Sequence, residues 1–485
     1  MDDGNNCSGN EGQVGLSPLY QFVYNLFIIY ALPMPSFDKD HAIVLGVLSQ
    51  KGLVSSQELQ DATGKSQATV SRLLDDLSSR VLVLGKARAT RYGLPKSIRG
   101  YGAQHPVWWT DAEGRVQRIG TLSLLMGDTL YVESDHVQAV TTSALPWFLA
   151  PLHVQGFLGR LHAQRLEQSG IGGNPEQWGL ESILFSALHL HDASGAMTIG
   201  MPDAHPNDSL EGPFSHVLSR REQLGSAFDR LAEAVAKTFP VGSSAGGEQP
   251  KFLAIIYLDD EPPRHVLVKF TPPRDTPYDE RWHDLLQAEA LASETLAEHG
   301  VAVAKSFVVE SETRTYLVSE RFDRIGESGR RHVVSVGDVH KAFVADSYSN
   351  WAATCAALAR QRRLSELDAE RVAALLAFGR LIGNSDMHSG NLGLFVELED
   401  LAKGRFALAP VYDMLPMRWR PNQVLGEAPD YTPFDVEGFA ATGGAARPAH
   451  DFWLRLAGSR KVSAGMVDLA VEMAKRVAEV GRLSS

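Results

Sequence analysis

The residues and patterns that the sequence lacks already exclude several classes of protein. The 485-residue chain has only two cysteines, Cys7 and Cys355, and no CxxC pair or Cys/His cluster, so it offers neither a disulfide framework nor a zinc site. We therefore expect a cytoplasmic protein. Acidic residues outnumber Lys and Arg by 58 to 46, which excludes a protein that coats nucleic acid over its whole surface. The sequence also has no internal repeat or low-complexity tract.

Apolar runs long enough to cross a membrane are also missing. The one candidate, Leu19 to Leu32, is interrupted by Gln21 and Asn25 and follows an acidic segment, where a signal peptide carries positive charge. We therefore expect neither a signal peptide nor a membrane anchor. Our hypothesis is that Met34 is the physiological start.

The segment from Asp38 to Pro95 predicts three short helices followed by a two-stranded hairpin. The third helix begins at Ser66 and has an apolar stripe on one face and short or basic side chains on the other, as a reader of the DNA major groove requires. Strands at 81–84 and 90–92 flank a basic turn. This pattern resembles a winged helix-turn-helix, and the alternative is a helical interaction module without DNA contacts. The predicted DNA-binding residues are Gln67, Thr69, Ser71, Arg72, Lys86, Arg88 and Arg91.

A basic run overlaps the predicted wing. Between Leu77 and Thr110 no Asp or Glu occurs. The basic residues in this run are Arg80, Lys86, Arg88, Arg91, Lys96 and Arg99. The run either contacts DNA phosphates or forms a solvated positive face.

After an amphipathic helix predicted at 228–239, the sequence changes to a glycine- and serine-rich stretch followed by strand-like apolar runs. We expect strands at 252–258, 264–270, 301–309 and 314–319, a helix at 284–298, and a largely helical C-terminal third.

Four features in this region occur in an order that phosphoryl transfer explains. The first is a loop of small residues at 242–251, where backbone N–H groups can approach phosphate oxygens closely. The second is Lys269 at the end of an apolar strand, with Glu289 on the following helix as the candidate to orient it. The third is ERFDR, residues 320–324, whose position suits a hinge that binds adenine, with Phe322 packing on the base.

The fourth feature, GNSDMHSGNLGLF, carries the most chemistry. It places Asp386 and Asn391 five residues apart, and Asp413 follows after a second strand. A carboxylate for the acceptor hydroxyl, followed by an amide and a second carboxylate for Mg²⁺, is the catalytic apparatus of kinases. Asp386 is therefore the predicted catalytic base, and Asn391 and Asp413 are the predicted metal ligands. We interpret His388 as a residue that holds the loop, because Asp386 already fills the role of base.

The ordered set SSAGGEQPK, LVKF, ERFDR, NSDMHSGN and YDMLP resembles HipA-like serine/threonine kinases, the toxins of bacterial toxin and antitoxin pairs. With its fused winged helix, the chain is similar to the YjjJ-type branch of that family. The resemblance implies ATP and Mg²⁺ as cofactors and autophosphorylation at Ser243 or Ser244. The nucleotide-binding residues predicted from these motifs together are Ser244, Ala245, Gly246, Gly247, Lys251, Lys269, Glu289, Glu320, Phe322 and His388.

The fold implied by the resemblance is α+β. An N-terminal winged helix precedes a bilobal, protein-kinase-like domain with an antiparallel-sheet N-lobe and a mostly α-helical C-lobe. The expected domains are an N-terminal extension (1–37), the winged helix (38–98), the N-lobe with its phosphate loop (99–335) and the C-lobe (336–485).

The function implied is a toxin that transfers the γ-phosphate of ATP to Ser or Thr of a protein, such as a translation factor or an aminoacyl-tRNA synthetase. Its winged helix would bind double-stranded DNA, for example its own operator, and the chain could form a homodimer. No membrane partner is expected. Two alternatives stay open: a small-molecule phosphotransferase of the aminoglycoside or choline kinase type, and a DNA-binding regulator whose kinase-like domain senses a nucleotide.

Overall fold

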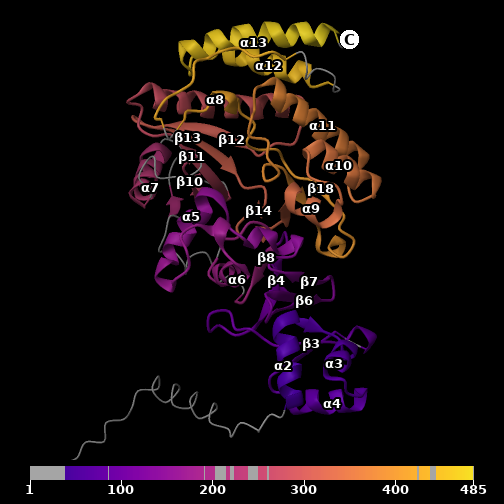
Figure 1. The fold of residues 1–485 in the computed structure, drawn as a ribbon. Helices are drawn as coiled ribbons and strands as arrows, with labels where there is room; N and C mark the ends of the chain where they lie inside the picture. The colour runs from indigo at the N-terminus through magenta and orange to yellow at the C-terminus, as the bar shows by residue number, and fades with distance from the viewer. Residues whose placement is uncertain are drawn as a thin grey trace, which may run out of the picture.

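The computed structural model describes nine stretches of the chain. Together they form an elongated molecule, with α4 at one end and α13 at the other (Figure 1). The described residues are 39–85, 87–190, 192–201, 215–218, 223–238, 249–258, 262–422, 425–436 and 444–483. The N-terminal extension, Lys86 of the wing and the loop residues from Ser243 to Gly247 lie outside them. The expectations for those residues stay predictions.

The N-terminal unit has the element order of a winged helix. Its elements are α2 (Lys39–Lys51), β1 (Leu53–Val54), α3 (Ser56–Thr63), α4 (Gln67–Asp76), β2 (Leu82–Leu84) and β3 (Arg91–Gly93). The strands form one antiparallel sheet in the order β1-β3-β2. Ser55 and Glu58 form a capping box at the start of α3, and Gly64 ends that helix with a left-handed φ of 66°. Ser66 caps α4, as predicted.

A middle unit follows, built on a five-stranded antiparallel sheet in the order β7-β6-β5-β4-β8. Its strands are β4 (Gln104–Thr110), β5 (Val116–Leu125), β6 (Thr129–Ser134), β7 (Gln138–Thr142) and β8 (Met197–Ile199). The helices α5 (Gly156–Arg165) and α6 (Leu180–Leu188) lie between β7 and β8 in the chain. β8 therefore returns from a distant part of the sequence to pair with β4.

The winged helix is packed onto this middle sheet. Leu84 of the wing shares an apolar cluster with Leu125 and Tyr131 of β5 and β6. At Gly52 the contact is so close that a Cβ atom would lie 2.1 Å from Oγ1 of Thr129. Because Gly52 also has a left-handed φ of 72°, no other residue fits this approach without strain.

A second five-stranded sheet has the order β12-β13-β11-β10-β9 and is antiparallel except for the pair β9 and β10. Its strands are β9 (Ser215–Leu218), β10 (Lys251–Tyr257), β11 (Arg264–Phe270), β12 (Ser306–Glu310) and β13 (Thr315–Glu320). The helices α7 (Leu224–Thr238) and α8 (Pro277–Glu298) pack against this sheet. The two sheets lie in succession along the chain within residues 99–335.

The two largest differences from the predicted element boundaries in this sheet region are the starts of α8 and β12. The helix expected from 284 begins at Pro277, because Thr276 and Asp279 form a capping box and proline is favourable at the first helical position. The strand expected from 301 begins only at Ser306. The preceding residues pair with another segment: Ala304 N–H donates to the Val411 carbonyl at 2.9 Å.

The C-terminal part is mainly helical, as predicted. Its helices are α9 (Val336–Phe343), α10 (Trp351–Arg360), α11 (Glu366–Leu381), α12 (Ala446–Ala457) and α13 (Ala464–Leu483). A small antiparallel sheet joins β16 (Val333–Ser335), β17 (Gly393–Phe395) and β18 (Ala407–Leu408). α12 and α13 cover α8 at the end of the molecule opposite the winged helix (Figure 1). The predicted α+β class is thereby confirmed.

None of the helices that the structure describes is long and apolar enough to cross a bilayer.

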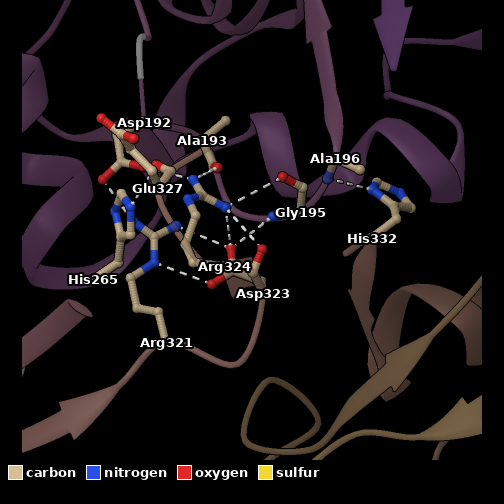
Figure 2. Close-up of polar contacts among 10 residues, drawn as sticks. All are labelled: Asp192, Ala193, Gly195, Ala196, His265, Arg321, Asp323, Arg324, Glu327 and His332. Atoms are coloured by element: carbon tan, nitrogen blue, oxygen red, sulfur yellow. Dashed lines mark hydrogen bonds and ion pairs between the residues drawn. The ribbon is translucent and has the colours of Figure 1, made fainter. Parts of the chain in front are cut away.

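The buried imidazole of His332 joins the middle unit to β16. Its Nδ1 accepts the N–H of Ala196 at 3.1 Å (Figure 2). Its Nε2 lies 2.9 Å from the Phe148 carbonyl. The first contact requires an unprotonated Nδ1 and the second a proton on Nε2, so the geometry admits only the neutral ring. Burial accordingly lowers the pKa of His332 to about 4.

This histidine makes the stability of the fold depend on pH. In the unfolded chain an imidazole takes up a proton near pH 6.5, whereas folded His332 does so near pH 4. The stabilisation is complete above pH 6.5 and is lost as pH falls through 4, by about 3 kcal/mol in total. In His332→Gln, whose side chain can offer the same acceptor and donor, the stability gap to wild type should shrink over this interval. Urea unfolding at pH 7, 5.5 and 4 measures the gap, and a constant gap would contradict the assignment.

Candidate active site

The centre of the site is the ammonium group of Lys269 on β11. Nζ lies 2.6 and 2.8 Å from the two carboxylate oxygens of Glu289 on α8, and it also contacts the carboxylate of Asp413. The Lys269 and Glu289 side chains are only 7% and 5% exposed. Three residues that lie far apart in the sequence and were predicted to act on one nucleotide therefore meet at a single buried charge.

The pKa values at this centre reflect burial opposed by charge. Burial alone would lower the pKa of Lys269, but the carboxylates of Asp413 and Glu289 outweigh it and raise that pKa above its ordinary value. Burial would raise the pKa of Asp413, but the positive charges of Lys269 and Lys251 hold it at about 2. At Glu289 burial prevails over Lys269, so its pKa is raised. Asp413 is thus charged at neutral pH.

Lys251 reaches the same region because of strand register. It opens β10, and it is the direct cross-strand partner of Lys269 on β11. Directly opposed residues of antiparallel strands project from the same face of a sheet. Two lysines therefore share the face that Asp413 approaches, and together they are suited to an anionic ligand such as a triphosphate.

Asp413 is held in place by its backbone. Its φ of 56° lies in the left-handed region, which aspartate adopts far less readily than glycine. Two residues earlier, Val411 exchanges hydrogen bonds of 2.9 Å with Ala302 and Ala304, which follow α8 in the chain. The segment that presents Asp413 is therefore anchored beside the helix that presents Glu289.

The loop after α11 carries the other two predicted catalytic residues, Asp386 and Asn391. The Nδ2 group of Asn391 donates to the Asp386 carbonyl at 2.9 Å and closes the loop. Asn384, which is 5% exposed, accepts the N–H of Asp386 at 2.9 Å and donates to the Asp413 carbonyl at 3.1 Å. One buried amide thus fixes the spacing between Asp386 and Asp413. The sequence analysis missed Asn384; the signal was a polar residue directly after Gly383, which ends the helix.

Two aromatic residues support the same loop. The indole N–H of Trp351 donates to the His388 carbonyl at 2.8 Å, and the Tyr412 hydroxyl donates to the Gly390 carbonyl at 2.9 Å. The ring of His388 is exposed, and its Nδ1 accepts the Gly390 N–H at 3.0 Å. This contact agrees with the interpretation of His388 as a loop-holding residue.

The predicted hinge residues lie where β13 ends. Glu320 forms an ion pair of 2.7 Å with Arg264 on the neighbouring strand. The Phe322 ring packs against Tyr412 and Phe395, with ring centroids 5.7 and 5.8 Å apart. Phe322 is thereby placed next to the segment that carries Asp413.

The donor set at this centre fits a magnesium ion that brings most of its own ligands. Among the described residues no group of three or more His, Cys, Asp or Glu could hold a metal. Mg²⁺, however, commonly uses one or two protein oxygens and completes its shell with water and phosphate. Asp413 supplies a carboxylate, and Asn391 keeps its Oδ1 for a ligand because its Nδ2 is bound to the loop.

Helix α4, which carries the predicted DNA-binding residues from Gln67 to Arg72, lies at the end of the molecule remote from the middle unit (Figure 1). Gln67, Ser71, Arg72 and Arg88 are exposed, whereas Thr69 is half-buried. The half-buried Arg91 donates to the Arg88 and Thr90 carbonyls, so it also braces the wing.

The basic run does not form one surface. Lys96 lies 3.0 Å from both Asp128 and Glu181, and Arg99 donates to the Ser169 and Gly170 carbonyls. The C-terminal part of the run therefore ties the winged helix to the middle unit.

Comparisons with known proteins identify the family. A model of the YjjJ-like toxin middle domain matches residues 101–205, and a model of the HipA-like C-terminal domain matches residues 243–480. The chain is 35% identical to Toxin YjjJ of Escherichia coli (strain K12) over 447 residues, which are 89% of this chain and 96% of that protein. The chain belongs to the HipA-like toxin family, YjjJ type. In this HipA-like toxin the middle-domain match contains the sheet of β4 to β8, and the C-terminal match contains Lys269 and the loop of Asp386 and Asn391.

Two solved structures are similar over large parts of the chain. HipA of Shewanella oneidensis MR-1, solved with HipB and its operator DNA, is 16% identical, covers 78% of this HipA-like chain and 97% of its own, and has a TM-score of 0.47. The proinflammatory kinase CtkA of Helicobacter pylori is 14% identical, covers 50% of this chain and 92% of its own, and has a TM-score of 0.31.

The role of Asn384 can be tested without an activity assay. Asn384→Ala removes the acceptor of the Asp386 N–H, so hydrogen exchange at that amide should accelerate and the free energy of unfolding should fall by about 2 kcal/mol. Asn350→Ala is a matched control, because Asn350 caps α10 and accepts only the N–H of Ala353. The control should lose about 1 kcal/mol and leave exchange at Asp386 unchanged. Equal exchange at Asp386 in both variants would contradict the assignment.

Proposed function

We propose that this HipA-like toxin is an ATP- and Mg²⁺-dependent serine/threonine protein kinase with its own DNA-binding domain. The observation that carries the proposal is the convergence of Lys269, Glu289 and Asp413 at one buried point. Through hydrogen bonds to Asp413 and Asp386, Asn384 holds the loop of Asp386 and Asn391 next to that point. These are the groups that phosphoryl transfer requires: a fixed cation for phosphates, oxygen ligands for a metal and a base for the acceptor.

Each residue then has a stated task. Lys269, oriented by Glu289, pairs with the α- and β-phosphates of ATP, and Lys251 adds a second positive charge. Asn391 and Asp413 hold Mg²⁺, which when bound neutralises charge on the phosphate oxygens. The backbone of the hinge after Glu320 binds the adenine base, and Phe322 provides apolar surface beside it.

The chemical step uses Asp386. Its carboxylate accepts the proton of the acceptor hydroxyl as the hydroxyl oxygen bonds to the γ-phosphorus, and ADP leaves with the electrons of the broken P–O bond. The loop residues Ser243 or Ser244 are candidate acceptors within the chain, and the other acceptor is a serine or threonine of a protein. The small-molecule and nucleotide-sensor readings differ from this proposal in the acceptor and in whether transfer occurs.

Variants at Lys269 and Asp386 separate binding from chemistry. Lys269→Ala should abolish measurable binding of Mg²⁺ and ATP in calorimetry, because the phosphates lose their buried cation. Asp386→Asn should retain ATP but lower the rate of phosphoserine formation at least about 100-fold. Lys403→Ala is the control, since Lys403 is a surface lysine beside Asp400.

The outcomes of this experiment distinguish the alternatives. Undiminished ATP binding by Lys269→Ala contradicts the proposal. ATP turnover stimulated by choline or amino sugars, without phosphoprotein, favours the small-molecule phosphotransferase. Nucleotide binding without any transfer by the wild-type chain favours the sensor.

We further propose that α4 reads double-stranded DNA, including the operator of its own gene. The support is the exposure of Gln67, Ser71 and Arg72 on a helix that projects from the end of the molecule (Figure 1). The wing adds Arg88 and, beyond the described residues, Lys86.

Replacing Arg72 tests this interface. Arg72→Ala should weaken binding to a promoter duplex and, if Arg72 contacts a phosphate, reduce the slope of log affinity against log salt by about 1. Arg99→Ala is the matched control, because Arg99 belongs to the same basic run but bonds to the middle unit. Fluorescence anisotropy at several salt concentrations measures both. Equal losses in the two variants would argue against a specific α4 interface.

A further inference from the structure

A buried network of four charges connects the middle unit to the predicted hinge (Figure 2). Asp192, which follows α6, accepts from Arg321 at 2.6 Å and from Arg324 at 2.5 Å. Asp323 accepts from the same two guanidinium groups at 2.7 to 3.1 Å. Each arginine therefore bridges one aspartate of the middle unit and one of the hinge.

The backbone completes this connection. The N–H of Gly195 donates to the Asp323 carboxylate at 2.9 Å, and the Arg324 guanidinium donates to the Ala193 carbonyl at 2.6 Å. The network thus forms hydrogen bonds with both side-chain and main-chain groups of a short stretch of the middle unit, residues 192–195. The two family models assign this stretch and the hinge to different domains, so the network crosses a domain boundary.

The hinge side chains point in two directions. Arg321, Asp323 and Arg324 contact the middle unit, as Figure 2 shows. Phe322, between them, packs against Tyr412 and the C-terminal part. Because neighbouring residues are held from opposite sides, the backbone between Glu320 and Arg324 has little freedom to move.

Burial of the charged groups explains why the network serves geometry more than stability. Arg330 adds a positive charge near its two arginines and two aspartates, and three of the four side chains are at most 8% exposed. Burying such groups costs about as much as their attraction returns, so a network of this kind mainly selects one arrangement. Asp192 is the most accessible member, at 28% exposed, and is the one that the middle unit contributes as a side chain.

We propose that Asp192 is a positioning residue of the nucleotide site: through Arg321 and Arg324 it fixes the hinge in the form that binds adenine. The inference rests on the proposed kinase function and deepens it, because it assigns to the middle unit the task of positioning the hinge of the nucleotide site. Asp192 acts through the arginines and does not touch the nucleotide.

The adenine base gives this role a distinct signature. A displaced hinge weakens contacts to the base alone, so Asp192→Asn should weaken binding of adenosine and of Mg·ADP by the same factor, about tenfold. Lys269→Ala should weaken Mg·ADP but not adenosine, because it removes a phosphate contact. In turnover, Asp192→Asn should raise the KM for ATP about tenfold and change kcat less than about twofold.

Two further variants control for general loosening of the middle unit. Lys96→Met removes two ion pairs to Asp128 and Glu181 in the same unit, and it should lower the melting temperature without changing adenosine affinity. Arg321→Lys keeps the charge but loses the bidentate contact with Asp323, and it should reproduce the adenosine defect even if Asp192→Asn folds poorly. Asp192→Glu, which retains the carboxylate, should recover part of the adenosine affinity.

The full-length variants are measured by calorimetry with adenosine and Mg·ADP, beside thermal melting. Adenosine affinity that stays at the wild-type level in both Asp192→Asn and Arg321→Lys overturns the inference, as does an equal loss in Lys96→Met. These results leave the proposed function standing as long as Lys269→Ala loses Mg·ADP. If Lys269→Ala retains Mg·ADP, the proposed function itself has failed.

Discussion

The HipA-like part of this protein is arranged around one buried ammonium group. Lys269 can remain charged in a dry environment only because Glu289 and Asp413 compensate it. That requirement couples three elements: the strand β11, the helix α8 and the segment that follows β18. Any rearrangement that removed one of these elements would leave an uncompensated buried charge. The free-energy cost of such a charge favours the arrangement in which all three elements stay together.

The position of α8 shows how far this constraint extends. Asp284, on the same helix as Glu289, is 1% exposed and accepts from the hydroxyls of Tyr431 and Ser463 at 2.5 Å each. Arg281 donates to two backbone carbonyls of the C-terminal part and stacks on the Tyr431 ring at 3.6 Å. The helix that carries Glu289 is therefore fastened to the C-terminal part through its first turns. The pairing of Lys269 with Glu289 thus depends on the packing of α8 on the C-terminal part.

Local signals in the sequence predict most helices and strands and name the residues that meet at the Lys269 centre. Ser66 and Gly64 bound their helices as caps do, and the order of Lys269, Asp386 and Asp413 indicated a common site before any fold was known. Apolar periodicity predicts a later start for α8 than the structure has, because the helix begins at the capping box of Thr276 and Asp279, ahead of the periodic residues. The strand boundary at Ser306 depended on pairing with Val411, which no local pattern reveals.

The residues that the sequence analysis missed share a different property: their partners are distant. The role of Asn384 can be recognised only when the fold places Asp413 beside it. The role of Asp192 likewise depends on its contact with Arg321, which lies 129 residues further along the chain. The basic run was misleading for the same reason. Lys96 and Arg99 belong by sequence to a positive stretch, yet their partners come from the middle unit.

The packing of the wing on the middle sheet has a consequence for how the molecule is oriented. The cluster of Leu84, Leu125 and Tyr131 places the first unit on β5 and β6 of the middle sheet, and Gly195, just before the edge strand β8 of the same sheet, contacts Asp323. The middle sheet therefore lies between the N-terminal unit and the segment that carries Asp323. Because both contacts are made within the chain, they set the orientation of α4 relative to the Lys269 centre.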